Sequence, residues 1–301
     1  MKKPVSLHLV QQISSQNLLL RDIIEHAASK FAEAGIESSL VDAELLAGFV
    51  LDLNRGGVQL EIIKGTQLSD SQAAAITELY GRRLLREPLQ HITGKAYFRN
   101  LELAVGKGVF VPRPETEFVA QLAIDALRSV PGAEPIAVDL GTGSGAIALA
   151  MATEVTHSKV FAVEKSIEAM PFTAANFATY GGQNATLIQG DLKDAFEELN
   201  GLVSVVASNP PYIPLDSIPR DLEVRLHDPD LALYGGFDGM DVVHQVSKTA
   251  KRLLHPGATL IIEHADSQAE QVCQLLLADG WRQVRAHRDL TGRDRAVTAI
   301  R

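Results

Sequence analysis

The sequence predicts a two-domain α/β protein, in which a small all-helical domain precedes a doubly wound, mostly parallel sheet. Apolar residues recur at helical spacing through the first part of the chain. A short segment of alternating residues with several glycines and prolines follows, and strand-like runs then alternate with helical ones. We therefore expect a helical domain at residues 1–86, a β-hairpin linker at residues 87–116 and a sheet domain at residues 117–301.

The composition is that of a soluble protein without covalent cross-links. Of its 301 residues 46% are hydrophobic and 22% are charged, and Cys273 is the only cysteine, so no internal disulfide can form. The net charge of −9 has the wrong sign for neutralising many phosphates. The N-terminus lacks a signal-peptide pattern, and no run approaches the ~20 apolar residues of a membrane helix. We expect a cytoplasmic monomer that binds neither membrane nor nucleic acid and needs no metal.

The helical domain shows recognisable helix ends. Ser69 and Asp70 are expected as N-caps, while Gly35 and the pair Gly56–Gly57 are expected to end helices. The basic segment at residues 80–91 is interpreted as a solvated helix face rather than a partner site.

Short apolar runs bounded by turn residues mark the strands of the sheet domain. Gly94, Gly106 and Gly108 supply turn signals for the hairpin that precedes it. Runs of this length, separated by helical patterns, predict buried parallel strands. The expected strands are residues 135–140, 159–164, 185–191, 203–208, 258–264 and 296–300.

A glycine-rich loop follows the first of these strands, directly after Asp139. Glycines without side chains let a backbone approach a ligand closely, and the N–H groups of the following helix point towards it. The spacing fits a loop that binds either NAD or S-adenosylmethionine, and this choice stays open at this point. The expected cofactor contacts are Gly141, Thr142, Gly143, Ser144 and Gly145.

Acidic residues end the next two strands. Glu164 comes about twenty residues after the glycines, where such folds place a carboxylate against ribose hydroxyls. A weaker alternative is that Glu164 only caps the following helix. Asp191 occupies the equivalent position after the third strand, where it meets an adenine amine or serves as an N-cap, with equal weight on both.

The segment "NPPY", residues 209–212, stops the fourth strand next to the glycine loop. Neither proline can donate to a β-ladder, so an ordinary strand end is the simplest interpretation. A cofactor loop beside it favours a chemical role. Methyl transfer to a planar –NH₂ group needs acceptors for both N–H bonds. The Asn209 side-chain oxygen and the Pro210 carbonyl would supply them, while Tyr212 stacks on the flat group.

Together with "DLGTGSG", this segment resembles amino-methyltransferases that use S-adenosylmethionine to modify adenine, cytosine or glutamine amides. Further blocks are similar to the peptide chain release factor glutamine methyltransferase family, a group of protein-(glutamine-N5) methyltransferases. These blocks are "REPLQHITGKAYF", "VFVPRPETE", "EVRLHDPDLALYGGFDGMDVV", "IIEHADSQAEQV" and "RDLTGRDRAV". The resemblance implies a Rossmann-like S-adenosylmethionine-dependent sheet joined by a β-hairpin to a helical domain that recognises the substrate.

The resemblance also implies roles for individual residues. The cofactor would contact the glycine loop, Glu164, Leu192 and Asn209. Leu192 departs from relatives that carry tryptophan there, and Ala265 from a common glycine. The resemblance implies a substrate glutamine bound by Phe98, Arg113, Asn209, Pro210, Pro211 and Tyr212, with the segment at residues 113–116 lining the site.

The expected activity is methylation of the glutamine in the Gly-Gly-Gln motif of class 1 peptide chain release factors, which would be its protein partners. A ribosomal-protein glutamine methyltransferase is the nearest alternative, and the block "PRPETE" favours the release factor. An adenine-N6 nucleic-acid methyltransferase is disfavoured by the negative charge and the absence of an evident basic target-recognition domain.

Overall fold

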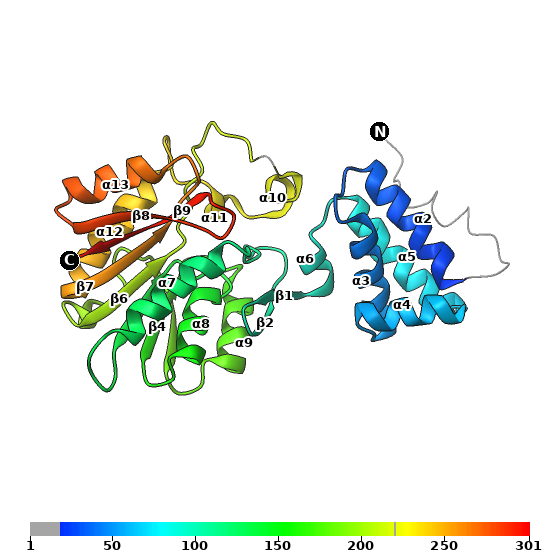
Figure 1. The fold of residues 1–301 in the computed structure, drawn as a ribbon, viewed down its shortest axis with the longest axis horizontal. Coiled ribbons are helices and arrows are strands. Elements are labelled where there is room, and N and C mark those ends of the chain that lie inside the picture. The colour runs from blue at the N-terminus through cyan, green and yellow to red at the C-terminus, as the bar shows by residue number, and fades with distance from the viewer. Residues whose placement is uncertain (1–18, 220) are drawn as a thin grey trace. The chain divides into compact units, whose positions relative to one another are not determined.

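A computed structural model describes residues 19–219 and 221–301 of the chain (Figure 1). The expectation about a signal peptide, and the first part of the predicted helical domain, concern residues 1–18 and lie outside these ranges. The chain divides into two units, one ending at Gly94 and one running Lys95–Arg301. This division falls inside the segment that we predict as the linker. Within the described ranges no helix is both long and apolar enough to cross a membrane.

The first unit is helical, as its apolar spacing predicts. A core of buried side chains from each of its described helices, including Leu20, Leu46, Ile76 and Ile92, holds it together. The helices are α2 (Leu20–Glu33), α3 (Ser39–Leu51), α4 (Arg55–Lys64), α5 (Asp70–Leu84) and α6 (Leu89–Thr93).

The helix ends follow the sequence signals in part. Ser69 caps α5 through a reciprocal capping box with Gln72, and the left-handed Gly35 follows α2. The expectation that Gly56–Gly57 ends a helix is wrong, because both glycines lie in the first turn of α4. The Asn54 side chain accepts from the Gly57 N–H at 2.8 Å and starts this helix just before them.

The basic segment in α5 is used partly inside the helical unit. Arg83 is buried and pairs with the buried Asp42 at 2.8 Å, while Arg82 pairs with Glu87. At Arg83 the interpretation as a solvated face is therefore wrong, because a buried carboxylate draws the guanidinium inward.

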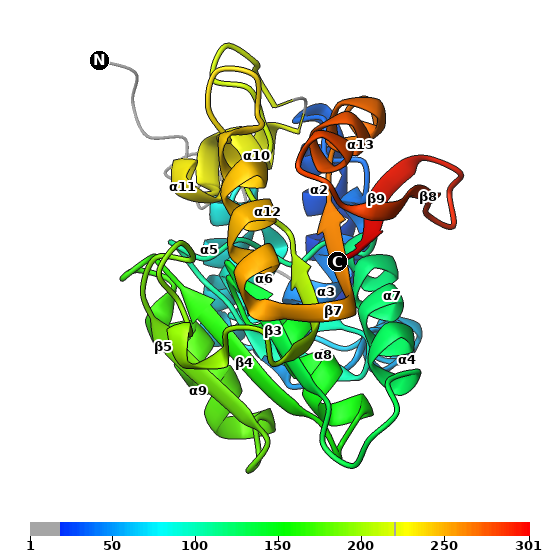
Figure 2. The same ribbon diagram turned by 90° about the vertical axis from the view of Figure 1, so that its left-hand side faces the viewer.

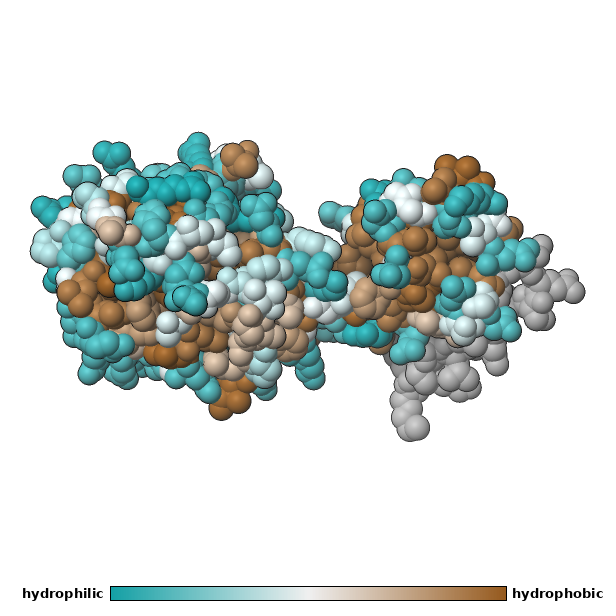
Figure 3. Space-filling model, turned by 90° about the horizontal axis from the view of Figure 1, so that it is seen from below, coloured by the Kyte–Doolittle hydropathy of each residue, from teal (hydrophilic) through white to brown (hydrophobic). Residues whose placement is uncertain are grey.

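The helical unit also keeps apolar side chains at its surface. Figure 3 shows a broad hydrophobic area on its visible face. The exposed large apolar side chains from α3, α4 and the turn between them are Leu40, Phe49, Leu53, Leu60 and Ile63.

The second unit begins with the predicted hairpin, formed by β1 (Lys95–Phe98) and β2 (Leu101–Ala104). The two strands are antiparallel, with Ala96 opposite Leu103 and Phe98 opposite Leu101. Alternate residues face inward, so Phe98 and Leu103 are fully buried in the core beside the main sheet.

A seven-stranded sheet forms the centre of this unit, in the order β5-β4-β3-β6-β7-β9-β8. The first five strands in this order are parallel and β9 is antiparallel to both of its neighbours. The predicted doubly wound α/β sheet is thereby confirmed. The strands are β3 (Ile136–Leu140), β4 (Lys159–Glu164), β5 (Ala185–Gln189), β6 (Val203–Ser208), β7 (Leu254–Glu263), β8 (Arg282–Arg288) and β9 (Asp294–Ile300).

Helices cover both faces of the sheet, and the strand alternation assigns residues to each face. Ala137 of β3 and Val205 of β6 join one core, while Val138 and Val206 join the other. Figure 2 shows the sheet between α8 on one side and α12 on the other. The helices of this unit are α7 (Thr116–Arg128), α8 (Ala146–Glu154), α9 (Met170–Tyr180), α10 (Leu222–His227), α11 (Asp230–Leu233), α12 (Asp241–Leu253) and α13 (Ala269–Ala278), with a 3-10 turn at Glu197–Leu199.

Candidate functional site

A cavity of about 1000 Å³ opens at the carboxyl ends of the parallel strands, within the second unit. Its lining includes Asp139 at the end of β3, Glu164 at the end of β4 and Asn209 just after β6. This edge is where open α/β sheets bind ligands, and the volume suits a nucleotide-sized molecule.

The glycine loop forms one wall of this cavity. Gly141 and Gly143 have left-handed backbones with φ of +78° and +56°, a conformation that residues with side chains rarely adopt. Gly145 also has positive φ and caps α8, but it does not line the cavity, because its Cα faces the ring of Phe177.

Asp139 stabilises the glycine loop by hydrogen bonds to the loop and to the helix that follows it. Its Oδ2 accepts from the Thr142 hydroxyl at 2.6 Å and from the Ala148 N–H at 3.1 Å. Its Oδ1 is buried and has no hydrogen-bond partner. Burial raises the pKa of this carboxyl to about 7. An unpartnered acceptor at the cavity wall fits a ligand that brings a donor.

Glu164 ties the glycine loop to the end of β4. Its Oε2 accepts from the Gly143 N–H at 2.7 Å, and its Oε1 accepts from the Ser166 N–H at 2.6 Å. Burial raises the pKa of the carboxyl, and the backbone N–H bonds partly offset this rise. Each oxygen has a second lone pair, so Glu164 has acceptor capacity left for hydroxyl groups in the cavity.

Asp191 and Leu192 also line the cavity, after β5. Asp191 accepts from the Lys193 N–H at 3.1 Å and pairs with Lys165 at 3.0 Å. No helix begins at Asp191. It therefore caps a turn and faces the cavity at the same time.

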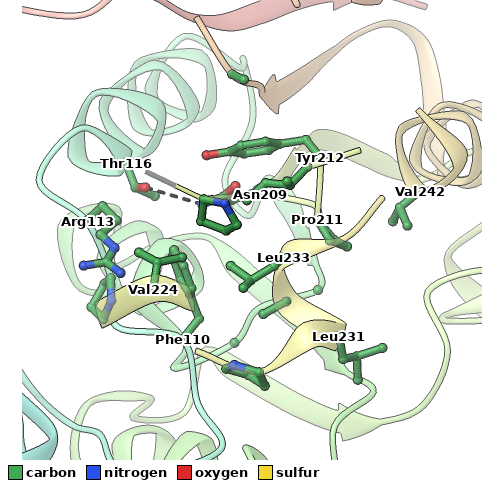
Figure 4. Close-up of a pocket in the computed structure, with 18 of the residues that line it drawn as sticks. Phe110, Arg113, Thr116, Asn209, Pro211, Tyr212, Val224, Leu231, Leu233 and Val242 are labelled. Atoms are coloured by element: carbon green, nitrogen blue, oxygen red, sulfur yellow. Dashed lines mark hydrogen bonds between the residues drawn. The ribbon is translucent and has the colours of Figure 1, made fainter. Parts of the chain in front are cut away.

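The second half of the cavity is built around the NPPY segment (Figure 4). Asn209 donates from Nδ2 to the Thr116 hydroxyl oxygen at 3.4 Å, and Pro211 and Tyr212 lie beside it. Pro210 is buried and does not line the cavity.

Tyr212 is held at both ends. Its hydroxyl donates to Glu263 Oε1 at 3.5 Å, and its main-chain carbonyl accepts from Gln268 Nε2 at 2.8 Å. Burial is the main cause that raises the pKa of the Tyr212 phenol, so it stays protonated.

Two glycines press against the NPPY backbone. A Cβ on Gly235 would come within 2.4 Å of the Pro211 carbonyl oxygen, and one on Gly239 within 2.2 Å of the Tyr212 oxygen. Only glycine permits this close approach. The sequence analysis did not single them out, although both lie in the block "LYGGFDGMDVV".

Arg113 lines the cavity, and Figure 4 shows it on the same side of Asn209 as Thr116 and Val224. Its guanidinium pairs with Asp228 at 2.7 Å and stacks on Phe110 at 5.1 Å from the ring centre. Burial raises the pKa of Asp228 to about 6, against the effect of Arg113.

The two halves of the cavity come from different parts of the chain. The strand ends and loops at residues 139–192 supply the half around the glycine loop. Residues 110–116 and the long connection from β6 to α12, residues 209–240, line the part around Asn209 (Figure 4).

Two predicted substrate residues do not line the cavity: Pro210, which is buried next to Asn209, and Phe98. Phe98 is fully buried in the core of the second unit and does not line the cavity, so its assignment to the substrate is corrected to a packing role. The alternation of the short hairpin strand turns its aromatic ring inward.

Glu263 is the clearest residue that the sequence analysis missed. It ends β7, the neighbour of β6, and only 1% of it is exposed. Burial raises the pKa of its carboxyl to about 7. An acidic residue at the end of an apolar strand is the signal that identified Glu164, and the same signal was available here. Among the described residues, no group of three His, Cys, Asp or Glu side chains is arranged to hold a metal ion.

Comparison with known proteins places this site in a family. The chain is 47% identical over 285 residues to the release factor glutamine methyltransferase of Streptomyces coelicolor, an alignment that covers 94% of this chain and 98% of the relative. The chain belongs to the release factor glutamine methyltransferase family. Residues 22–94 match the model of the PrmC N-terminal domain, and residues 100–220 match the Methyltransferase small domain. The predicted family and the Rossmann-like methyltransferase fold are confirmed.

The relatives of this chain do not all carry the same name. A Streptomyces pristinaespiralis relative, 35% identical with coverage of 94% of this chain and 95% of its own, is named a 4-amino-L-phenylalanine/4-methylamino-L-phenylalanine methyltransferase. A solved release factor-specific protein-(glutamine-N5) methyltransferase from Alicyclobacillus acidocaldarius is 27% identical, with a TM-score of 0.40, and covers 64% of this chain and 94% of its own.

Proposed function

We propose that this protein transfers a methyl group from S-adenosylmethionine to the side-chain amide nitrogen of the glutamine in the Gly-Gly-Gln motif of class 1 release factors. The observation that carries the proposal is the position of Asn209. Its amide lies in the same cavity as the glycine loop and Glu164, so the methyl-accepting amide of the substrate and the cofactor can meet there. Membership of the family supports the same acceptor.

The lining of the first half of the cavity fits S-adenosylmethionine. We propose that the glycine loop contacts the methionine part, with the unpartnered Asp139 Oδ1 as an acceptor for a donor on it. Glu164 has acceptor capacity for ribose hydroxyls, and Asp191 and Leu192 are proposed contacts for the adenine end. When bound, this cofactor supplies an electrophilic methyl group on a sulfonium.

The residues of the second half would hold the acceptor amide. We propose that Asn209 Oδ1 accepts a hydrogen bond from one N–H of the glutamine and that Tyr212 stacks on the amide plane. Pro211 and Arg113 would line the space around the substrate. The Pro210 carbonyl is the proposed second acceptor, although Pro210 does not line the cavity in this structure. Acceptors fixed where positive charge grows on nitrogen each stabilise the transition state by about 3 kcal/mol.

The test is to incubate the purified protein with methyl-labelled S-adenosylmethionine and a class 1 release factor, then locate the label by mass spectrometry. Label is expected on the Gly-Gly-Gln glutamine, and the release factor with that glutamine changed to glutamate should stay unlabelled, because a carboxylate has no N–H₂ group. Parallel reactions contain ribosomal proteins, DNA, RNA or 4-amino-L-phenylalanine. Label on one of these alone would move the assignment to that acceptor.

We further propose that the helical unit recognises the release factor away from the reacting loop. A specific protein complex usually buries ~1,200–2,000 Å² in total, more than a cleft around one amide supplies. The exposed apolar side chains of α3 and α4, such as Phe49, Leu60 and Ile63, offer surface of this kind.

Deletion of residues 1–94 is expected to lower kcat/KM on the intact release factor by about tenfold or more, mainly by raising KM. A tenfold change corresponds to ~1.4 kcal/mol of binding free energy. The cut follows α6, because Ile92 of α6 belongs to the helical core. On a short Gly-Gly-Gln peptide the truncated and full-length enzymes should be equally slow. Circular dichroism and cofactor titration check that the remaining unit, which has its own cores, is folded. Full kcat/KM in a folded truncated enzyme would remove the recognition role.

A further inference from the structure

The strongest unassigned feature lies behind Asn209, where Glu263, Thr116 and Tyr212 meet. Glu263 is 1% exposed and sits at the end of β7, next to the strand that leads into Asn209. Its Oε1 receives the Tyr212 hydroxyl at 3.5 Å, and its Oε2 has no hydrogen-bond partner of its own. A buried carboxylate oxygen without a donor is costly, so a nearby donor that can rotate towards it is significant.

The Thr116 hydroxyl is such a donor. Thr116 is the first residue of α7, is 4% exposed, and lies near enough to Glu263 for its hydroxyl to lower the pKa of that carboxyl, although no hydrogen bond joins the two side chains in this structure. The same hydroxyl oxygen receives Nδ2 of Asn209 at 3.4 Å (Figure 4). Thr116 therefore stands between the buried carboxylate and the amide of Asn209.

When Glu263 is ionised, above its pKa of about 7, this series of hydrogen-bonding groups has only one consistent order of donors and acceptors. A carboxylate can only accept, and a hydroxyl has one proton to give. Once Thr116 donates to Glu263, its oxygen can only accept, and the neighbouring atom of Asn209 must be the NH₂ group. The Asn209 oxygen is then turned away from Thr116. An amide in the opposite orientation would bring two oxygens together without a proton between them.

We propose that Glu263 and Thr116 are positioning residues that fix the amide orientation of Asn209, so that its oxygen and not its NH₂ group faces the acceptor nitrogen. This inference rests on the proposed function, because only the oxygen of Asn209 can accept a hydrogen bond from the substrate amide. Glu263 also receives the Tyr212 hydroxyl, so one buried carboxylate sets both the amide orientation and the ring that stacks on the substrate.

The test compares two substitutions at Thr116 in the full-length enzyme. Thr116→Val has nearly the same shape without the hydroxyl, and kcat on the release factor should fall by about tenfold or more, since the wrong amide orientation becomes accessible. KM for the release factor and Kd for S-adenosylmethionine should stay within twofold. Thr116→Ser, which keeps the hydroxyl, should retain kcat within about threefold of the wild type.

Glu263→Gln supplies an independent second measurement. A glutamine can present either an oxygen or an NH₂ group to Thr116. The order of hydrogen-bond donors and acceptors from residue 263 to Asn209 is then no longer enforced, so kcat should fall. Because both residues set the orientation of the Asn209 amide, their effects on kcat should not multiply in the double variant. Thermal unfolding of each variant, monitored by circular dichroism, shows that it is folded.

Three results would overturn the inference while wild-type enzyme labels the release factor. These are a kcat within twofold of wild type in Thr116→Val, a Thr116→Ser variant as slow as Thr116→Val, and effects of Thr116→Val and Glu263→Gln that multiply. Wild-type enzyme that labels no release factor instead overturns the proposed function, and this inference with it.

Discussion

Asn209→Ala is expected to lower kcat on the release factor by about 10²-fold or more, the effect of losing one fixed polar contact to a transition state. The affinity for S-adenosylmethionine should stay within a few-fold, because the half of the cavity proposed to bind the cofactor is lined by other residues, among them Glu164 and the glycine loop. Single-turnover rates with saturating cofactor measure the first quantity, and calorimetric titration measures the second.

Asn200→Ala is the matched control for this experiment. Asn200 is exposed, does not line the cavity, and accepts only from Arg252 at the surface. It should leave both kcat and cofactor affinity unchanged. If Asn209→Ala weakens cofactor binding as much as it slows turnover, the proposed role of Asn209 in holding the substrate glutamine is wrong.

Glu164→Ala should have the opposite effect, with much weaker cofactor binding and a nearly unchanged kcat at saturating cofactor. Removing its carboxylate leaves the N–H groups of Gly143 and Ser166 without their partner and removes the proposed acceptor for the ribose. Hydrogen bonds to a charged group contribute ~1.5–3 kcal/mol each, so Kd for S-adenosylmethionine should rise by roughly 10²-fold. At cofactor concentrations well above this Kd, kcat should recover to within a few-fold of wild type.

Glu198→Ala is the control for this variant, since Glu198 is exposed and lies outside the cavity. Calorimetry on both variants, beside thermal unfolding without cofactor, separates lost binding from lost folding. A Glu164→Ala enzyme that binds the cofactor with wild-type affinity but does not turn over would contradict the assignment.

The sequence was sufficient for much of the sheet because buried parallel strands are continuous apolar runs. Residues 203–208 are an example, and the polar residue after such a run lies at the ligand-binding edge. The same reasoning missed β8, Arg282–Arg288. This edge strand pairs only with β9 and is largely exposed, so its sequence is mostly polar and lacks an apolar run.

The remaining errors concern which way a side chain faces and what it meets far along the chain. The hairpin block containing Phe98 was matched by resemblance, which does not say that the ring turns into the core. The contact of Thr116 with Asn209 depends on how α7 meets the end of β6, and no local pattern encodes that meeting. Gly56–Gly57 was misjudged because the Asn54 side chain outweighed the tendency of glycine to end a helix.

The division of the cavity between two stretches of chain also bears on how such an enzyme changes during evolution. Residues 139–192 hold one half, whereas the connection from β6 to α12 lines the part around Asn209. If the proposed roles of the two halves hold, mutations that reshape this connection should alter the methylated substrate and leave the proposed cofactor half intact. Gly235 and Gly239 mark the limit of that freedom, because each touches the backbone of the NPPY segment. Diversification of acceptors is therefore expected in the side chains of this connection, around a fixed glycine framework.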